Sequence, residues 1–375
     1  MSQTPLHELH AHGQSVWLDF LSRDLVDSGE LARLVAEEGV RGMTSNPTIF
    51  QEAIKGSDTY DEDIRRLGAQ GLSPEEMFEA IAVDDIASAC DVLRPVFDES
   101  GMTDGFVSLE VSPRLAHDTE GTVEEARRLV AAVDRPNLMI KVPATPAGLP
   151  AVETLITEGV NVNITLIFAQ AVYRGVVDAY LSALENRAAA GEPVDDVASV
   201  ASTFVSRIDT AVDARLEELL AERADDADEI RALLGKAAIA NSKAVYEIFE
   251  EISASERYQA LAADGAQPQR PLWASTSTKN PEYPPTLYVD ELIGPNTVNT
   301  MPSVTMDAFR EQGEVQPTVS SDPDYWSGVL ERLAALGVDL DAVMDQLQDE
   351  GVQKFIDSYD DLLQDLEAKA GALAS

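Results

Sequence analysis

The sequence of 375 residues is poor in cysteine and lysine and has no long apolar run. One cysteine, Cys90, excludes an internal disulfide and a metal site built from several cysteines. No stretch reaches the roughly 18 to 20 apolar residues that a membrane-spanning helix requires. The polar segment 1–13 does not resemble a signal peptide. These absences predict a cytoplasmic protein without a membrane partner.

Basic residues are also scarce, with 27 lysines and arginines against 67 acidic residues and a net charge of −40. Such a charge disfavours nucleic acid and anionic membranes as partners. The acidic residues are spread along the chain, and they repel one another unless salt screens them. We predict a halophilic protein, with an ordinary acidic cytosolic protein as the alternative. The oligomeric state stays open between monomer and homodimer.

Segments with strand character alternate with helical segments along the whole chain. This alternation is typical of an α/β fold with a parallel sheet, and eight such strands predict a (β/α)₈ TIM barrel. We expect one barrel domain over residues 1–375, with extra helices and a C-terminal helical extension from about residue 322. The predicted strands are Ser15–Phe20, Gly42–Asn46, Gly105–Val111, Leu138–Ala144, Asn161–Phe168, Ala198–Val205, Pro271–Thr276 and Thr297–Met301.

Several helix ends carry capping signals. Glu30–Glu38 precedes Gly39, a residue suited to end a helix. Ser73 precedes a proline and two glutamates, which predicts a helix start. The run from Thr122 to Glu125 also fits a capping box. The long stretch 210–263 predicts two or three helices, and 339–373 predicts helices after the last strand.

Lys141 is the most informative residue, because it interrupts an apolar strand in a chain with seven lysines. Lysine is almost never fully buried without a reason. Burial disfavours its ammonium form and favours a neutral amine, which can form a Schiff base with a carbonyl substrate. The other lysines lie in turn-like or amphipathic surroundings. A lysine whose ammonium group reaches solvent at the strand end is the alternative interpretation.

Polar residues recur late in the other strands, on the face that Lys141 shares by alternation. Trp17 pairs with Asp19 on one face, and Trp273 with Ser275. In a TIM barrel, side chains at these strand ends surround one site. Two carboxylates beside a Schiff-base lysine can move protons, and arginine can bind a phosphate. The predicted pocket comprises Asp19, Thr44, Asn46, Glu110, Lys141, Asn163, Thr165, Ser202, Phe204, Arg207, Ser275 and Lys279.

Three other functions compete with this interpretation. A Schiff-base aldolase could release the fragment that it cleaves from its substrate, or transfer it to an acceptor. Phe204 offers no proton to a water in the pocket, which favours transfer. A zinc hydrolase is disfavoured, because beyond His10 and His12 too few histidines remain for a catalytic site. A non-catalytic barrel used for binding or assembly would leave the inward Lys141 and the two carboxylates unexplained.

Ordered motifs across the chain resemble transaldolase, and the longer bacterial branch of that family is the most similar. They are Trp17-Leu18-Asp19, Thr44-Ser45-Asn46-Pro47, Ser108-Leu109-Glu110-Val111, Ile140-Lys141-Val142-Pro143-Ala144-Thr145, Val162-Asn163-Ile164-Thr165, Phe204-Val205-Ser206-Arg207-Ile208-Asp209, Trp273-Ala274-Ser275-Thr276 and Glu350-Gly351-Val352-Gln353-Lys354-Phe355. The resemblance implies transfer of a dihydroxyacetone unit between sugar phosphates, in the non-oxidative pentose phosphate pathway, without metal or organic cofactor.

The resemblance also implies individual roles. Lys141 matches the Schiff-base lysine, Asp19 the acid/base carboxylate, and Glu110 with Thr165 the pair that holds a catalytic water. Substrate contacts are implied for Asn46, Asn163 and Ser202, and phosphate contacts for Arg207 and Ser275.

The chain departs from the family pattern at Phe20, Ser45 and Ala169. We expect the side chains of Phe20 and Ser45 to point away from the pocket. A second phosphate-binding arginine has no match, and Lys279 is the candidate to replace it.

Overall fold

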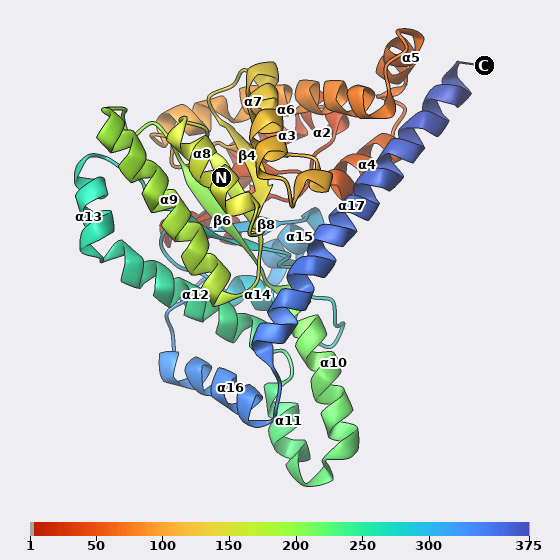
Figure 1. Cartoon of the computed structure of the whole chain (residues 1–375). Coiled ribbons are helices and arrows are strands. Elements are labelled where there is room, and N and C mark those ends of the chain that lie inside the picture. Colours follow the sequence, from red (N-terminus) through yellow and green to blue (C-terminus); the bar gives the residue numbers. More distant parts are fainter. Residues whose placement is uncertain (1–3, 375) are drawn as a thin grey trace.

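The computed structural model describes residues 4–374 as a closed barrel of eight parallel strands, in which β8 pairs with β1 (Figure 1). The predicted TIM barrel is confirmed, and every strand end lies within two residues of its predicted position. The strands are β1 (Gln14–Leu18), β2 (Val40–Thr44), β3 (Val107–Glu110), β4 (Leu138–Pro143), β5 (Val162–Ile167), β6 (Ser199–Phe204), β7 (Arg270–Ala274) and β8 (Thr297–Met301).

Helices surround the barrel and extend beyond it. They are α1 (Pro5–Ala11), α2 (Arg23–Asp27), α3 (Glu30–Glu38), α4 (Pro47–Gly56), α5 (Asp61–Ala69), α6 (Pro74–Glu99), α7 (Thr119–Val133), α8 (Gly148–Thr157), α9 (Gln170–Ala190), α10 (Ser206–Glu222), α11 (Ala227–Leu233), α12 (Ala237–Ser253), α13 (Glu256–Ala263), α14 (Leu287–Asp290), α15 (Ser303–Gln312), α16 (Pro323–Ala335) and α17 (Leu340–Leu373). Between residues 4 and 374, no helix is both long and apolar enough to cross a membrane.

The capping signals were right at two helices and wrong at one. Gly39 ends α3 with a φ of 76°, and Ser73 begins α6 in a capping box with Glu76. Helix α7, however, begins before Thr122. The side chain of Asp118 caps it by accepting from the Gly121 N–H, while the Thr122 hydroxyl donates to the Leu115 carbonyl.

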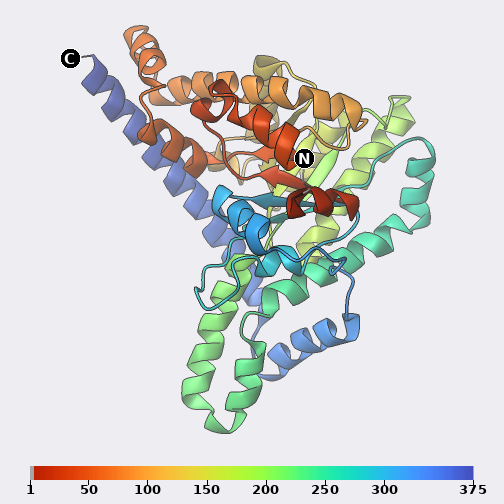
Figure 2. The ribbon, with the colours of Figure 1, turned by 180° about the vertical axis from the view of Figure 1, so that it is seen from behind.

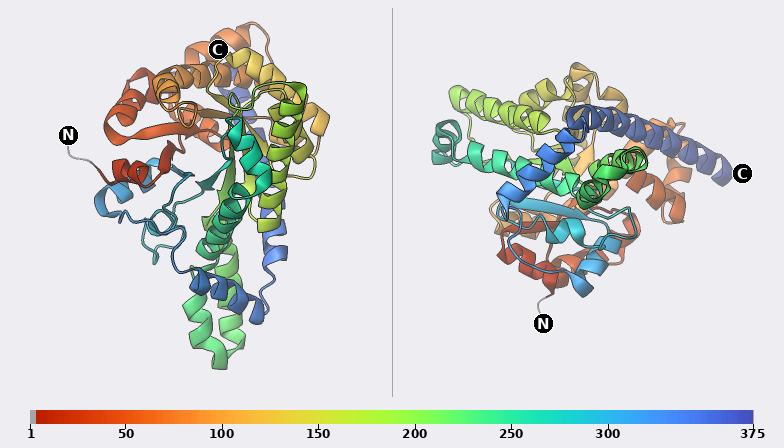
Figure 3. Two further views of the ribbon diagram at one scale, coloured as in Figure 1. Left: turned by 90° about the vertical axis from the view of Figure 1, so that its left-hand side faces the viewer. Right: turned by 90° about the horizontal axis from the view of Figure 1, so that it is seen from below.

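The long helical stretch 210–263 contains parts of four α-helices, where two or three were predicted. Helix α10 starts earlier than expected, at Ser206, directly after β6. Gly235, with a φ of 67°, lies between α11 and α12 and allows the chain to turn there. Figure 3 shows α10 and α11 extending away from the barrel.

Polar side chains fill the amino-terminal end of the barrel. Arg270 binds Asp104 at 3.1 Å and donates to the Ser15 hydroxyl at 2.6 Å. Trp17 points inward as predicted, and its indole N–H donates to Asp104 at 3.2 Å. Gly42 is required beside it, because a Cβ there would lie 2.5 Å from the Trp17 ring. This packing leaves the carboxyl ends of the strands as the place for a site.

Helix α17 lies across the carboxyl ends of the strands and reaches α5, where the C-terminus projects from the barrel (Figures 1 and 2). The amide of Gln348 donates to the carbonyls of Ala144, which follows β4, and Leu166, near the end of β5. Gly351 permits this approach, because a Cβ there would lie 2.9 Å from Leu166. The predicted C-terminal helices therefore cover the same barrel end that carries the candidate site residues.

Candidate active site

A cavity of about 400 Å³ opens at the carboxyl ends of the strands, beneath α17. Its volume falls within the usual range of roughly 300 to 1,000 Å³ for small-molecule sites. Predicted residues that line it are Asp19, Thr44, Asn46, Lys141, Thr165, Ser202, Phe204, Arg207, Ser275 and Lys279. Helix α17 adds two residues that sequence reasoning did not assign, Lys354 and Phe355.

Lys141 lies on β4 at the bottom of this cavity and is 5% exposed. Its Nζ donates to the Ser45 carbonyl at 3.2 Å and lies 3.6 Å from Glu110 Oε2. The ring centroid of Phe355 lies 5.7 Å from the same nitrogen. These contacts fix the amine inside the barrel, so the alternative in which it reaches solvent is wrong.

Burial is not unique to this lysine. Lys243 on α12 was expected in an amphipathic setting, but it is 3% exposed. Its Nζ donates to the Thr318 carbonyl and the Ser321 hydroxyl and pairs with Glu291. Because these contacts occupy the amine at a distance from the cavity lining, burial alone does not mark a nucleophile.

Two carboxyl groups lie near Lys141. Asp19 lines the cavity, whereas Glu110 lies outside its lining and approaches Lys141 Nζ to 3.6 Å. Burial raises the pKa of Glu110 to about 7, although the charge of Lys141 opposes the shift. Burial likewise raises the pKa of Asp19, against the charges of Lys141 and Lys279. A carboxyl group with a pKa near 7 can both donate and accept a proton at neutral pH.

Three oxygens beside Lys141 are buried and have no hydrogen-bond partner among residues 4–374. They are Glu110 Oε2, Thr165 Oγ1 and Thr44 Oγ1. The distance of 3.6 Å between Glu110 and Lys141 is an electrostatic contact, too long for a good hydrogen bond. Buried polar atoms usually have partners, so these oxygens are available to a substrate or water.

Asn46 and Asn163 serve the site in different ways. Asn46 caps α4 by accepting from the Ile49 N–H, and it lines the cavity. Asn163 lies outside the cavity lining, since its amide donates to Ser108 at 3.0 Å and its oxygen accepts from Ser202 at 2.6 Å. Asn163 therefore orients Ser202, which does line the cavity.

Ser275 reaches the cavity for a reason other than strand alternation. Strand β7 ends at Ala274, and Ser275 has a φ of 58°. The predicted shared face with Trp273 is wrong, because the Trp273 indole donates to the Leu292 carbonyl outside the barrel wall. Register pairs place Leu272 and Ala274 beside the inward Ser202 and Phe204.

The departures from the family pattern at Phe20 and Ser45 do not place a new side chain in the cavity. The Ser45 hydroxyl donates to the Ser108 carbonyl at 2.8 Å. Its backbone carbonyl nevertheless binds Lys141, a contact that any residue at this position can provide.

Three cations gather at one end of the cavity: Arg207, Lys279 and Lys354. None of them forms an ion pair with a carboxylate in the described part of this acidic chain. Asp209, the alternative partner of Arg207, accepts instead from Tyr288 and the Ala238 N–H. Burial, followed by the charges of Lys354 and Arg207, lowers the pKa of Lys279. A group of mutually repelling cations that form no ion pair with a carboxylate is typical of an anion site.

Lys354 could have been found in the sequence, because it belongs to the motif that begins at Glu350. The pattern of apolar and polar residues around Lys354 predicts an exposed helix residue. Only the packing of α17 against the barrel brings it to the cavity. His10 and His12 lie at the end of α1, and no group of metal-binding side chains occurs within residues 4–374.

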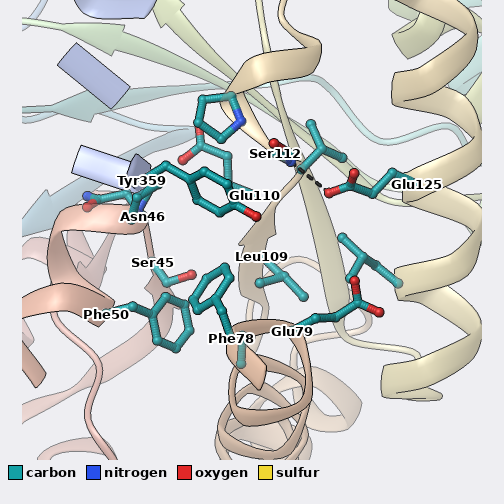
Figure 4. Close-up of a pocket in the computed structure, with 15 residues that line it drawn as sticks. Ser45, Asn46, Phe50, Phe78, Glu79, Leu109, Glu110, Ser112, Glu125 and Tyr359 are labelled. Atoms are coloured by element: carbon teal, nitrogen blue, oxygen red, sulfur yellow. Dashed lines mark hydrogen bonds between the residues drawn. The ribbon is translucent and has the colours of Figure 1, made fainter. Parts of the chain in front are cut away.

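A second, smaller cavity lies outside the barrel wall between α6, α7 and α17 (Figure 4). Its lining includes Asn46, Glu110, Glu125 and Tyr359, and the Ser112 N–H donates to Glu125 at 2.8 Å. Its volume of about 30 Å³ holds roughly one or two waters. It is too small for a sugar phosphate, so the larger cavity is the candidate active site.

Comparison with known proteins identifies the family of the chain. Residues 16–366 match the family described as Transaldolase/Fructose-6-phosphate aldolase. The chain is 51% identical over 373 residues to a transaldolase of Parafrankia sp. (strain EAN1pec), covering 99% of both chains. It is 52% identical over 368 residues to a transaldolase of Frankia alni, covering 98% of both, and 48% identical over 365 residues to one of Mycolicibacterium smegmatis, covering 97% of both. The chain therefore belongs to the transaldolase/fructose-6-phosphate aldolase family.

Proposed function

We propose that this protein is a transaldolase that transfers a dihydroxyacetone unit between sugar phosphates through a Schiff base on Lys141. Fructose 6-phosphate and erythrose 4-phosphate would exchange with sedoheptulose 7-phosphate and glyceraldehyde 3-phosphate. The observation that carries the proposal is one cavity whose lining joins buried Lys141, Asp19 and a separate cluster of cations, with Glu110 3.6 Å from the lysine amine. The reaction belongs to the non-oxidative pentose phosphate pathway, which supports a cytoplasmic location.

The first half of the reaction cleaves the donor. The amine nitrogen of Lys141 adds to the ketose carbonyl at C2 while a proton passes from this nitrogen to the carbonyl oxygen, and Glu110 donates the proton that lets the carbinolamine lose water. Asp19 then accepts the proton of the C4 hydroxyl while the C3–C4 bond breaks. The electron pair of that bond moves to the iminium, which leaves an enamine on Lys141 and frees an aldose phosphate.

The second half runs these steps in reverse with another aldose. The enamine attacks the aldehyde carbon of the acceptor, and Asp19 returns its proton to the new hydroxyl. Water held between Glu110 and Thr165 hydrolyses the iminium and releases the new ketose phosphate. Arg207, Lys279, Lys354 and Ser275 hold the phosphate at the far end of the cavity. Lys354 is thus our proposed addition to the phosphate site.

The direct test is borohydride reduction in the presence of fructose 6-phosphate, followed by peptide mapping. We expect a stable adduct on Lys141 alone. Lys243 is a matched internal control, because it is equally buried but already bound to Thr318 and Ser321. An adduct on another lysine, or no adduct, would rule out the mechanism.

Transfer is favoured over release of dihydroxyacetone by the apolar wall at Phe204. This ring lines the cavity, and the guanidinium of Arg207 lies 5.0 Å from its centroid. It offers no proton to a water near the intermediate.

We expect Phe204→Tyr to shift the enzyme from transfer toward release, because a phenol can orient or protonate that water. The measurement is the ratio of free dihydroxyacetone to transferred product. Phe168→Tyr is the control, because the ring centroids of Phe168 and Phe204 are 5.3 Å apart but Phe168 does not line the cavity. An unchanged ratio in Phe204→Tyr would mean that Phe204 does not control water.

We also propose that the protein is adapted to high salt, on the basis of its net charge of −40. The Debye length shrinks from ~30 Å at 0.01 M salt to ~3 Å at 1 M, so repulsion between surface carboxylates falls steeply. We expect the melting temperature to rise steeply from low to molar potassium chloride, measured together with turnover. A flat melting temperature would contradict salt adaptation and leave the enzymatic proposal intact.

A further inference from the structure

Two buried carboxyl groups on α10 join elements that lie next to the phosphate end of the cavity. Asp209 and Asp213 are one turn apart, and neither forms an ion pair in the described chain. One oxygen of each accepts from the backbone before or in α12: Asp213 from the Gly235 N–H at 2.9 Å, and Asp209 from the Ala238 N–H at 2.7 Å. Both groups therefore hold α10 against the start of α12.

The second oxygen of each group accepts from a tyrosine that follows β7. Tyr288, in α14, donates to Asp209 at 2.9 Å. Tyr283, in the loop between β7 and α14, donates to Asp213 at 2.6 Å. The Tyr283 ring also packs on Gly235, where a Cβ would lie 2.8 Å from the ring. Tyr283 is thus held by both its hydroxyl and its ring.

The same loop carries Lys279 and is held at its other end by α10. The Ser206 N–H donates to the Ser275 carbonyl at 3.0 Å, and the two hydroxyls are 2.9 Å apart. Arg207 follows Ser206, so one helix presents Arg207 to the cavity and fixes the loop on both sides of Lys279. Between these two anchors, Lys279 is exposed and its ammonium group contacts the Ser277 hydroxyl at 2.7 Å.

From this geometry we propose that Tyr283 and Asp213 are positioning residues, whose hydrogen bond keeps Lys279 at the cavity and thereby sets the affinity for the phosphate of the substrate. The inference rests on the proposed function. Its physical basis is preorganisation: a cation already held in place binds an anion without the cost of ordering its loop. Burial raises the pKa of Asp213, whereas the hydrogen bonds from Tyr283 and the Gly235 N–H oppose this shift and favour the charged carboxylate.

The test compares Tyr283→Phe and Asp213→Asn with Tyr288→Phe. Tyr288→Phe is the matched control, because it removes the same kind of bond to the same helix but lies beyond the loop that carries Lys279. Lys354→Gln is the positive control for a lost phosphate cation. KM and kcat are measured with erythrose 4-phosphate and with erythrose, which lacks the phosphate.

For Tyr283→Phe we expect KM for erythrose 4-phosphate to rise roughly 5- to 20-fold. This is less than the full effect of a hydrogen bond to a charged group, because the lost bond positions Lys279 and does not touch the phosphate. The KM for erythrose and the kcat should stay within about twofold, and Tyr288→Phe should change only the melting temperature. Equal KM changes for both acceptors, or none, would overturn the inference.

Binding of inorganic phosphate, measured by calorimetry, separates this inference from the proposed function. If the wild-type protein transfers no dihydroxyacetone, the proposed function fails, but weaker phosphate binding by Tyr283→Phe than by Tyr288→Phe would still support the positioning role. If the wild-type protein is active and both variants bind phosphate as it does, only the positioning role is refuted.

Discussion

Lys141→Ala is expected to lower kcat by about four to six orders of magnitude, as removal of the nucleophile does in other covalent enzymes. The amine at this position is held by the Ser45 carbonyl, 3.6 Å from Glu110 and under the Phe355 ring. No other lysine among the described residues occupies this part of the cavity, so none can form the Schiff base there. Steady-state turnover of fructose 6-phosphate with erythrose 4-phosphate measures the effect.

Lys279→Ala is the control variant for Lys141→Ala. It removes a lysine from the same cavity, so a loss caused by the cavity charge alone would appear in both variants. We expect Lys279→Ala to raise KM and to keep most of kcat. Measurable transfer by Lys141→Ala at a rate near that of the wild type would refute Schiff-base chemistry at this residue.

Asp19→Asn and Glu110→Gln are expected to lower kcat by about 10² to 10⁴, the usual range for a lost general acid or base. Both replacements keep the shape of the side chain and remove its ability to accept a proton. Glu125→Gln is the matched control, since Glu125 is a carboxyl group in the smaller cavity whose pKa is also raised by burial. It should leave turnover unchanged.

The same variants have a predictable effect on stability. The pKa of Glu110 is raised from an ordinary value near 4.5 to about 7, so the folded state keeps a proton that the unfolded chain has lost. The free energy of unfolding therefore falls as pH rises through this window. Glu110→Gln has no carboxyl group at this position and does not lose stability in this way. Its melting temperature relative to that of the wild type should therefore rise between pH 5 and pH 8. A difference in melting temperature between variant and wild type that stays constant from pH 5 to pH 8 would contradict this assignment.

Comparison of the predicted and observed elements shows where local sequence information was sufficient. All eight strands were found because their alternating or continuous apolar character depends on neighbours along the chain. The same alternation placed Asp19, Lys141 and Thr165 at one cavity and Glu110 beside Lys141, since a closed parallel barrel brings its strand ends together. Gly39 marked the end of α3 and Ser73 the start of α6, because a helix cap also depends on residues that are close in the chain.

Local reasoning failed where two signals competed or where the backbone left the regular strand. Asp118 and Thr122 both fit a helix start, and the earlier residue prevailed at α7. Ser275 was assigned to the face of Trp273 by alternation, but its left-handed backbone turns it into the cavity independently of that face. The burial of Lys243 depends on Thr318 and Ser321, which lie far away in the chain.

The sequence by itself determined the barrel, the inward Lys141 and the two carboxyl groups near it, because strand periodicity and family motifs are properties of short segments. Only the tertiary structure decided that Lys354 and Phe355 of α17 line the cavity. The same holds for the hydrogen bond between Asn163 and Ser202, and for the one by which Tyr283 connects the Lys279 loop to α10. Each of these contacts joins residues from elements distant in the chain. Such contacts form only when the elements pack against each other. The residue pattern within one segment does not reveal which distant segment it will contact.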